Sequence, residues 1–296
     1  MNIIKLSRRE YNRLKPFLVS EYILHTESDL YEMKYCGERK IVKTMFTYDK
    51  DFHREKLRTL DTLDSYKSYL PEEFCIPDNL IAVGRRKPAF TVPYFKGDTL
   101  ANILNDPSIP IQEHLYYLKR VGEILEELSK IRRTSSLKEI YIGDLHESNI
   151  LVNPFTKELG IIDLDSCRIG TEFSYTSKYL TPFSLIKYQP DKYIQNQILG
   201  NGPGYIIPDS NSDIYCYIVM ILNYLTNDLY RYFSLDNFFN YLTLLNDLGI
   251  NKELLYLLEK LFTKDDNINP YEYLESLTTQ DITFARQAAK MLLTKH

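Results

Sequence analysis

One short stretch of the sequence sets ionisable and amide side chains between apolar residues. The segment Tyr141–Asn153, YIGDLHESNILVN, puts Asp144 and Asn149 five positions apart, and an aliphatic run follows the asparagine. The later segment IIDLDS carries Asp163 and Asp165 behind an aliphatic pair. Carboxylate and amide oxygens suit Mg²⁺, and a carboxylate can also accept the proton of a hydroxyl nucleophile. These residue types therefore indicate a site where a magnesium-bound phosphate meets a hydroxyl group.

The residues around this site predict two adjoining strands. NILVN and LGIIDL are short apolar runs, and the turn-forming segment NPFTKE joins them. Asn149 opens the first run and Asp163 closes the second, so we expect their oxygens to lie side by side as metal ligands. Asp144 follows an apolar pair and a glycine, which predicts a position at the end of a buried segment facing a cleft.

The first hundred residues predict a small antiparallel sheet that carries one helix. Apolar and polar residues alternate in several short runs, which is typical of strands; these runs are EYILH, DLYEMKY, RKIVKTMF, NLIAVG and AFTVPYF. Between them, the segment Asp51–Leu70 has Leu57, Leu60 and Leu63 at helical spacing, and Pro71 ends it.

The rest of the chain predicts mostly helices, with a boundary near residues 95–98. Helical apolar spacing recurs in the segments TLANILND, IQEHLYYLKRVGEILEELSKI, SDIYCYIVMILNYLTN, LDNFFNYLTLLNDLG, KELLYLLEKLFTK and NPYEYLESL. Residues 166–212 are rich in Pro, Gly, Ser and Tyr and predict a long functional loop. We therefore expect an α+β fold with two units, residues 1–95 and 96–296.

Composition narrows the classes of partner and the cell compartment. The chain has 296 residues and a net charge of −4, which argues against a nucleic-acid-binding surface. The longest apolar run, Ile214–Leu225, is too short to cross a membrane, and the N-terminus lacks a signal peptide pattern. The four cysteines show no metal-binding or disulfide spacing and favour a cytoplasmic protein; they are Cys36, Cys75, Cys167 and Cys216.

IGDLHESNILV followed by IIDLDS resembles the catalytic loop and the metal-binding segment of the protein-kinase-like superfamily. In that family the patterns are H-R-D-x-x-x-x-N and D-F-G. The resemblance implies that Asp144 is the catalytic aspartate and that Asn149 and Asp163 hold magnesium. It also implies a two-lobed fold, with a small antiparallel-sheet N-lobe carrying one main helix and a larger, mostly helical C-lobe.

The resemblance extends to the nucleotide-binding segments upstream. KIVKTMF resembles the V-A-I-K strand, which implies that Lys43 contacts the ATP phosphates, with Lys40 as the competing candidate. Glu55 best matches the glutamate that pairs with this lysine from the helix of the small lobe, and Asp61 is the alternative.

FTVPYFKGDTL resembles the hinge between the lobes, so backbone groups at Pro93, Tyr94 and Phe95 are expected to meet adenine. NSDIYCYIVMIL resembles the large-lobe helix that opens with a buried aspartate, here Asp213, which braces the catalytic loop. A helix N-cap is the other interpretation of Asp213, and the two are compatible because both bind backbone amides.

Several positions depart from the protein-kinase pattern. The stretch Leu24–Met33, where a glycine-rich loop belongs, has no glycine, and Gly143 replaces the arginine of H-R-D. His146 resembles the histidine of aminoglycoside and choline phosphotransferases; it is expected to contact the γ-phosphate or the catalytic aspartate, or to make a structural bond in the turn. Asp165 is expected either to assist the metal or to cap the turn.

These features together predict an ATP- and Mg²⁺-dependent phosphotransferase resembling bacterial serine/threonine protein kinases. The expected acceptor is a protein Ser/Thr hydroxyl, because the long loop and the C-terminal helices resemble a protein kinase's large lobe. A small-molecule kinase is the second interpretation, supported by Gly143, His146 and Asp165. A pseudokinase that serves as a binding module is the third. No nucleic-acid or membrane partner is expected, and the sequence does not indicate an oligomeric state.

Overall fold

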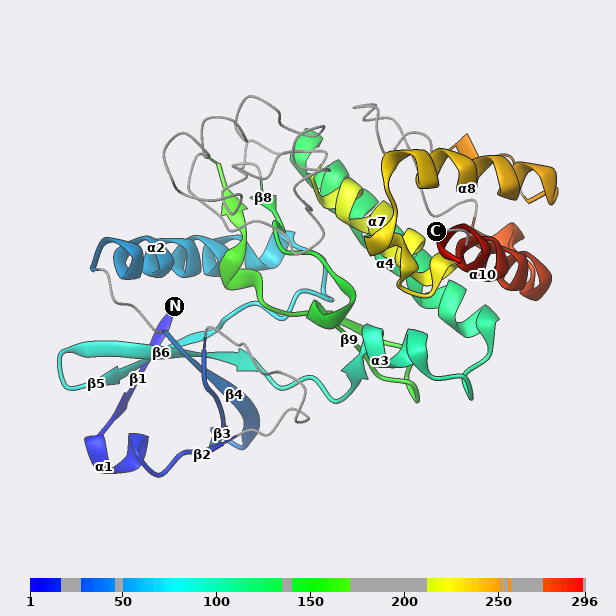
Figure 1. Cartoon of the computed structure of the whole chain (residues 1–296). Helices are drawn as coiled ribbons and strands as arrows, with labels where there is room; N and C mark the ends of the chain where they lie inside the picture. Colours follow the sequence, from blue (N-terminus) through cyan, green and yellow to red (C-terminus); the bar gives the residue numbers. More distant parts are fainter. Residues whose placement is uncertain are drawn as a thin grey trace.

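The fold combines a multi-stranded sheet with a set of helices, in agreement with the α+β class expected from the sequence (Figure 1). The computed structural model describes residues 1–16, 28–45, 50–134, 140–170, 212–250, 252, 255–256 and 274–294. Figure 1 shows the largest sheet at the lower left with helix α2 along one side of it, while α4, α7, α8 and α10 gather at the right.

A six-stranded sheet forms from the first part of the chain. Its strands lie in the order β1-β5-β6-β4-β3-β2; they are β1 (Asn2–Leu6), β2 (Lys15–Pro16), β3 (Leu30–Tyr35), β4 (Glu38–Thr44), β5 (Asn79–Val83) and β6 (Arg86–Pro93). Every neighbouring pair is antiparallel except β1 and β5, which run parallel. The sequence did not predict β1, and the purely antiparallel sheet is wrong at this edge, where Ile4 pairs with Ile81 and both are buried.

The side chains of β4 point alternately to the two faces of the sheet, so neighbouring residues of this strand contact different clusters. Val42 packs with Ile4, Ile81 and Ala89 in a buried cluster on one face. Lys43 lies opposite Phe90, whose side chain belongs to the cluster on the other face. The face that carries Lys43 is therefore the face that α2 covers.

Helix α2 (Lys50–Tyr66) follows the helical spacing predicted from the sequence, and the short 3-10 helix η1 (Lys67–Tyr69) continues it up to the turn before Pro71. Leu60 is fully buried and packs with Met45, Leu80 and Phe90. This contact holds α2 against the sheet.

The α-helices α3 and α4, with short strands and 3-10 helices, follow the sheet. The segment comprises β7 (Asp98–Thr99), α3 (Leu100–Asn105), α4 (Ile111–Thr134), β8 (Ile140–Tyr141), η2 (Glu147–Asn149), β9 (Ile150–Val152), β10 (Leu159–Ile161), η3 (Leu164–Ser166) and β11 (Arg168–Ile169). Antiparallel pairing joins β10, β9 and β7 in one small sheet and β11 with β8 in another. Gly97 precedes β7 without a side chain because a Cβ there would collide with the backbone of Val152.

The last described elements are helical and surround the larger core. They are α7 (Ser212–Thr226), η4 (Leu229–Tyr232), α8 (Leu235–Asp247), η5 (Leu274–Ser276) and α10 (Thr279–Leu293). The sequence did not predict α10, although Thr278 and Asp281 form a capping box at its start. Most of the expected long loop and of the expected helices KELLYLLEKLFTK and NPYEYLESL lies outside the described residues.

Helix α7 is apolar and mostly buried, but it has only 15 residues. Within the described ranges, no helix combines the length and the apolar character that crossing a membrane requires.

Removing the Leu60 side chain tests the contact between α2 and the sheet. Leu60→Ala is expected to lower the free energy of unfolding by about 2–5 kcal/mol, because it leaves a cavity in a fully buried cluster. The matched control Leu248→Ala changes a leucine that is 45% exposed and is expected to cost less than about 1 kcal/mol. Urea denaturation of both variants measures this; equal losses would contradict the packing described.

Candidate functional site

The hairpin of β9 and β10 brings the two predicted metal ligands together. Ile150 lies opposite Ile161, and the pairing continues one step further because the Ile162 N–H donates to the Asn149 carbonyl oxygen at 2.9 Å. Asp163 is the next residue along the chain. The expectation that Asn149 and Asp163 sit on adjoining strand ends is therefore confirmed.

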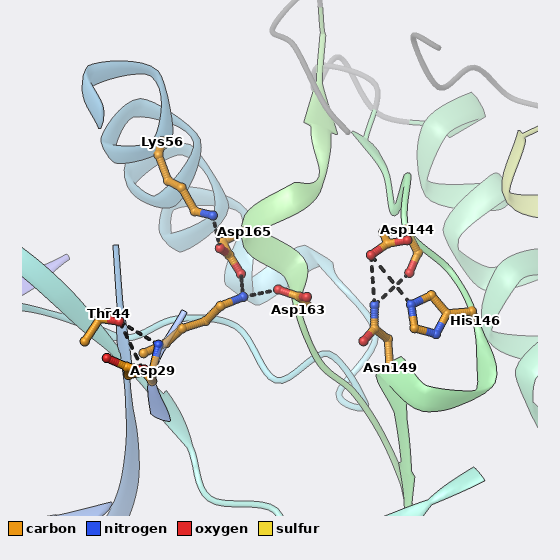
Figure 2. Close-up of polar contacts among 9 residues, drawn as sticks. Asp29, Thr44, Lys56, Asp144, His146, Asn149, Asp163 and Asp165 are labelled. Carbon is orange, nitrogen blue, oxygen red and sulfur yellow. Dashed lines mark hydrogen bonds and ion pairs between the residues drawn. The ribbon is translucent and has the colours of Figure 1, made fainter. Parts of the chain in front are cut away.

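Asn149 is oriented by Asp144 (Figure 2). Its Nδ2 donates to the Asp144 carbonyl oxygen at 3.0 Å and to Asp144 Oδ2 at 3.2 Å. Both bonds use the amide nitrogen, so the amide oxygen of Asn149 points away from Asp144. The Asn149 oxygen is thereby presented as an acceptor or metal ligand.

His146 belongs to the same loop and lies beside Asp144 (Figure 2). Its Nδ1 accepts a hydrogen bond from the Ser148 N–H at 3.2 Å, which places the proton of a neutral ring on Nε2. Nε2 lies 3.6 Å from Asp144 Oδ2, longer than a hydrogen bond but close enough for an electrostatic contact. His146 therefore combines the structural turn bond and the aspartate contact that the sequence offered as alternatives.

Asp213 holds the backbone that leads into Asp144. Its carboxylate accepts hydrogen bonds from the N–H groups of Ile142 and Gly143, each at 3.1 Å, and from Arg132 Nη2 at 2.7 Å. Asp213 is the second residue of α7 and is almost completely buried. The bracing role expected from the sequence is confirmed by these bonds.

Gly143 and Asp163 both have left-handed backbone conformations, with φ of 76° and 62°. This conformation is easy for glycine and uncommon for other residues, although aspartate tolerates it better than most. Gly143 therefore has a conformational reason to stand directly before Asp144. A left-handed backbone at a residue other than glycine, as at Asp163, often accompanies functional sites.

Lys43 reaches the aspartates from β4. Its Nζ donates hydrogen bonds to Asp163 Oδ1 and to Asp165 Oδ1, the second at 2.8 Å. Lys40, the competing candidate, forms ion pairs with Asp78 and Glu38, each at 2.7 Å. Of the two lysines, Lys43 is thus the one that contacts the predicted metal segment.

Helix α2 adds a residue that the sequence did not predict as part of the site. Lys56 Nζ forms an ion pair with Asp165 Oδ2, and Figure 2 shows the two side chains meeting. The signal in the sequence was a lysine on the buried stripe of α2, four and seven positions before Leu60 and Leu63 respectively. The side chain of Glu55 lies outside the described part of the chain, and Asp61 Oδ1 lies 3.6 Å from the Met1 amino nitrogen.

The cluster of two lysines and two aspartates perturbs its own pKa values. Burial alone would raise the pKa of Asp165, but the charges of Lys43 and Lys56 hold it well below the usual range. Burial raises the pKa of Asp163, the charge of Asp165 raises it further, and Lys43 opposes both effects. Burial lowers the pKa of Lys43, but Asp165 and Asp163 outweigh it, so that the net shift is upward. Of the two aspartates in the cluster, Asp165 is therefore the one whose ionised form is more strongly favoured.

Asp165 lies between the two cations with only 2% of its side chain exposed, and each of its oxygens faces a lysine. A carboxylate in this position has the charge and the geometry of an ion-pair partner, a role that the sequence did not suggest for it.

Within the part of the chain that the structure describes, no three His, Cys, Asp or Glu side chains converge as a metal cage. The donor set at Asn149 and Asp163 suits Mg²⁺ only if phosphate and water oxygens complete the shell, as is usual for this ion.

The predicted hinge residues lie at the end of β6 and directly after it. Pro93 ends this strand opposite Lys40, and the guanidinium of Arg39 stacks on the Tyr94 ring at 3.8 Å from its centroid. The Phe95 ring lies over Gly160 of β10, where a Cβ would collide with it. The segment Pro93–Phe95 therefore packs directly on the hairpin that carries Asn149 and Asp163.

The stretch Leu24–Met33, where the resemblance would place a glycine-rich loop, lies partly outside the described residues, which resume at residue 28. There the backbone of Asp29 pairs with Thr44: the Asp29 N–H donates to Thr44 Oγ1 at 2.8 Å, and the Thr44 N–H donates to the Asp29 carbonyl at 3.0 Å (Figure 2). These bonds fix the start of β3 beside the residue that follows Lys43.

No protein-family model matches this chain, and no curated protein matches it. The geometry of the site is therefore the basis for assigning a function.

Replacing Asp213 tests its bracing role. Asp213→Ala leaves Arg132 without its carboxylate and two buried N–H groups without an acceptor, so the free energy of unfolding should fall by about 3–5 kcal/mol. The matched control is Asp236→Ala, since Asp236 is the second residue of α8 but is exposed. Its expected cost is below about 1 kcal/mol, from the helix dipole alone. Chemical denaturation compares them; a small loss in Asp213→Ala would contradict the brace.

Proposed function

We propose that the protein is an ATP- and Mg²⁺-dependent phosphotransferase of the protein-kinase-like type. One observation carries the proposal: Lys43 and Asp163, 120 positions apart in the sequence, form an ion pair beside the Asn149 backbone. A strand lysine, a metal-binding aspartate and a neighbouring asparagine are the groups that bind ATP phosphates and magnesium in this class.

The arrangement of the chain supports a two-lobed fold of this type. The antiparallel strands β2 to β6 with α2 on one face correspond to the small lobe expected for residues 1–95. Residues 96–296 supply the helices α3, α4, α7, α8 and α10 and would form the large lobe. In this interpretation the segment Pro93–Phe95 is the hinge, and its backbone groups would meet adenine.

The role proposed for each site residue follows from the hydrogen bonds and ion pairs that it makes. Lys43 would bind ATP phosphates, since its ammonium group has three N–H donors and the described contacts use two. Asn149 Oδ1 and Asp163 would hold Mg²⁺, which when bound neutralises phosphate charge. Asp144 would orient the acceptor hydroxyl and take its proton while the hydroxyl oxygen bonds to the γ-phosphorus and the bond to ADP breaks. Asp213 binds the backbone N–H of Gly143, directly before Asp144, and Asn149 Nδ2 donates a hydrogen bond to the Asp144 carboxylate.

We propose a protein Ser/Thr hydroxyl as the acceptor and a cytoplasmic location, on the sequence grounds given above. A small-molecule alcohol is the second candidate, favoured by the contact of His146 with Asp144 and by the glycine at position 143. A pseudokinase that only binds is opposed by the joint presence of Lys43, Asp144, Asn149 and Asp163 in one arrangement. Phosphoryl-transfer measurements separate the three.

The first test is transfer of label from γ-labelled ATP with Mg²⁺ to the chain itself, a generic protein and a panel of small alcohols. We expect transfer by the wild type, reduced by at least about 10²-fold in Asp144→Ala and in Asp163→Ala. The exposed Asp236→Ala is the control and should keep full activity. Activity that survives both site changes would place the chemistry elsewhere, and nucleotide binding without any transfer would favour the binding module.

The second test compares the two lysines of β4. Lys43→Met is expected to weaken Mg²⁺·ATP binding by about 10- to 100-fold, because it removes a charged donor to the phosphates. Lys40→Met removes the partner of Asp78 and Glu38 on the opposite face, so it should lower stability but leave nucleotide affinity near the wild-type value. Calorimetric titration measures both affinities; the reverse order would assign the phosphate contact to Lys40.

A further inference from the structure

Helix α2 contributes a cation to the cluster around Lys43. Lys56 Nζ pairs with Asp165 Oδ2, and the other oxygen of the same carboxylate accepts a hydrogen bond from Lys43 Nζ at 2.8 Å. The side chains of Lys43 and Lys56 are only 15% and 11% exposed, and that of Asp165 is 2% exposed. Asp165 therefore bridges β4 and α2 in a place that is nearly closed to water.

We propose that Lys56 is a positioning residue for phosphoryl transfer: it holds Asp165, and Asp165 holds Lys43 toward the phosphates. Asp165 thereby supplies Lys43 with a carboxylate partner from outside the small-lobe helix. Helix α2 contributes the cation Lys56, and the segment after β10 contributes the anion Asp165. This inference rests on the proposed function, because the position of Lys43 matters to catalysis only if Lys43 binds phosphate.

Lys43 requires a second carboxylate, Asp165, because Asp163 is the proposed partner of both Lys43 and Mg²⁺. Asp163 accepts a hydrogen bond from Lys43 and is also the proposed ligand of Mg²⁺. A bound metal ion would compete with Lys43 for the Asp163 oxygens. Asp165 keeps a carboxylate against Lys43 in that state, since its Oδ1 is bonded to Lys43. Lys56 pairs with the other oxygen of the carboxylate, so turning Asp165 toward the metal would break this ion pair.

The packing of α2 directs Lys56 inward. Lys56, Leu60 and Leu63 are spaced at i, i+4 and i+7 and therefore share one face of the helix. Leu60 and Leu63 are fully buried, and α2 also contacts η3, which contains Asp165. The stem of Lys56 thus follows the buried face while its ammonium group reaches the carboxylate. Any shift of α2 along this face would be transmitted to Asp165 and from there to Lys43.

A double-mutant cycle on the full chain tests whether Lys56 acts through Asp165. Mg²⁺·ATP affinity is measured by calorimetric titration for the wild type, Lys56→Met, Asp165→Asn and the double variant. Each single change is expected to weaken binding by about 10- to 100-fold, the range for a hydrogen bond to a charged group. The double variant should bind no more weakly than Asp165→Asn, because the two residues act in series. Losses that multiply would mean that Lys56 acts independently, and would overturn the proposal.

Three comparisons separate positioning from a purely structural role. Lys56→Arg keeps the charge and should restore affinity to within a few-fold of the wild type. Arg58→Met removes an exposed cation from the same helix and should leave affinity unchanged. The midpoint of thermal unfolding is recorded for every variant. A lowered midpoint with wild-type affinity in Lys56→Met would show a structural role only and overturn the proposal. A single change can leave one buried charge of the Lys56–Asp165 pair without its partner and so cause misfolding. The double variant removes both charges and therefore avoids this effect.

The outcomes also distinguish this inference from the function on which it rests. A wild type that binds no Mg²⁺·ATP would overturn the proposed function and, with it, the positioning role. A wild type that binds Mg²⁺·ATP while Lys56→Met binds equally well would overturn the positioning role alone.

Discussion

The interaction on which the site depends is the buried cluster of Lys43, Lys56, Asp163 and Asp165. Charged groups are costly to remove from water unless they are paired, and unpaired partners in such clusters cost several kcal/mol. Because each member comes from β4, α2 or the segment after β10, satisfying the charges requires these three parts of the chain to meet. The cluster therefore fixes the sheet and its helix against the hairpin that carries Asn149.

A second constraint holds the loop that contains Asp144 in place. Asp213 binds two successive backbone N–H groups and the guanidinium of Arg132, whose Nε also donates to the Ile140 carbonyl at 2.6 Å. The loop is therefore anchored to α4 and α7, which belong to the large buried core, and the charge cluster is anchored to the sheet. Asp144 follows the backbone that Asp213 binds, and Asn149 is hydrogen-bonded through its backbone to Ile162, the residue before Asp163.

Much of the site was predictable from the sequence because it lies at the ends of short strands. Asn149 and Asp163 flank apolar runs joined by a turn, and hairpin pairing leaves them side by side. Lys56 was not predictable in the same way, since most helix lysines are solvated and its partner Asp165 is distant in the sequence. The edge strand β1 was missed because its place depends on the open edge of β5, a tertiary feature. The left-handed conformation of Asp163 was likewise not predicted, since aspartate tolerates this conformation but seldom adopts it.

The most direct measurement of the central claim is a crystal structure of the chain with Mg²⁺ and a non-hydrolysable ATP analogue. We predict that Lys43 Nζ contacts the phosphates, that Asn149 Oδ1 and Asp163 ligate the metal, and that adenine lies against the segment Pro93–Phe95. Lys43 should still be hydrogen-bonded to Asp165. An analogue bound away from this site, or a metal ion without Asn149 and Asp163 among its ligands, would contradict the account.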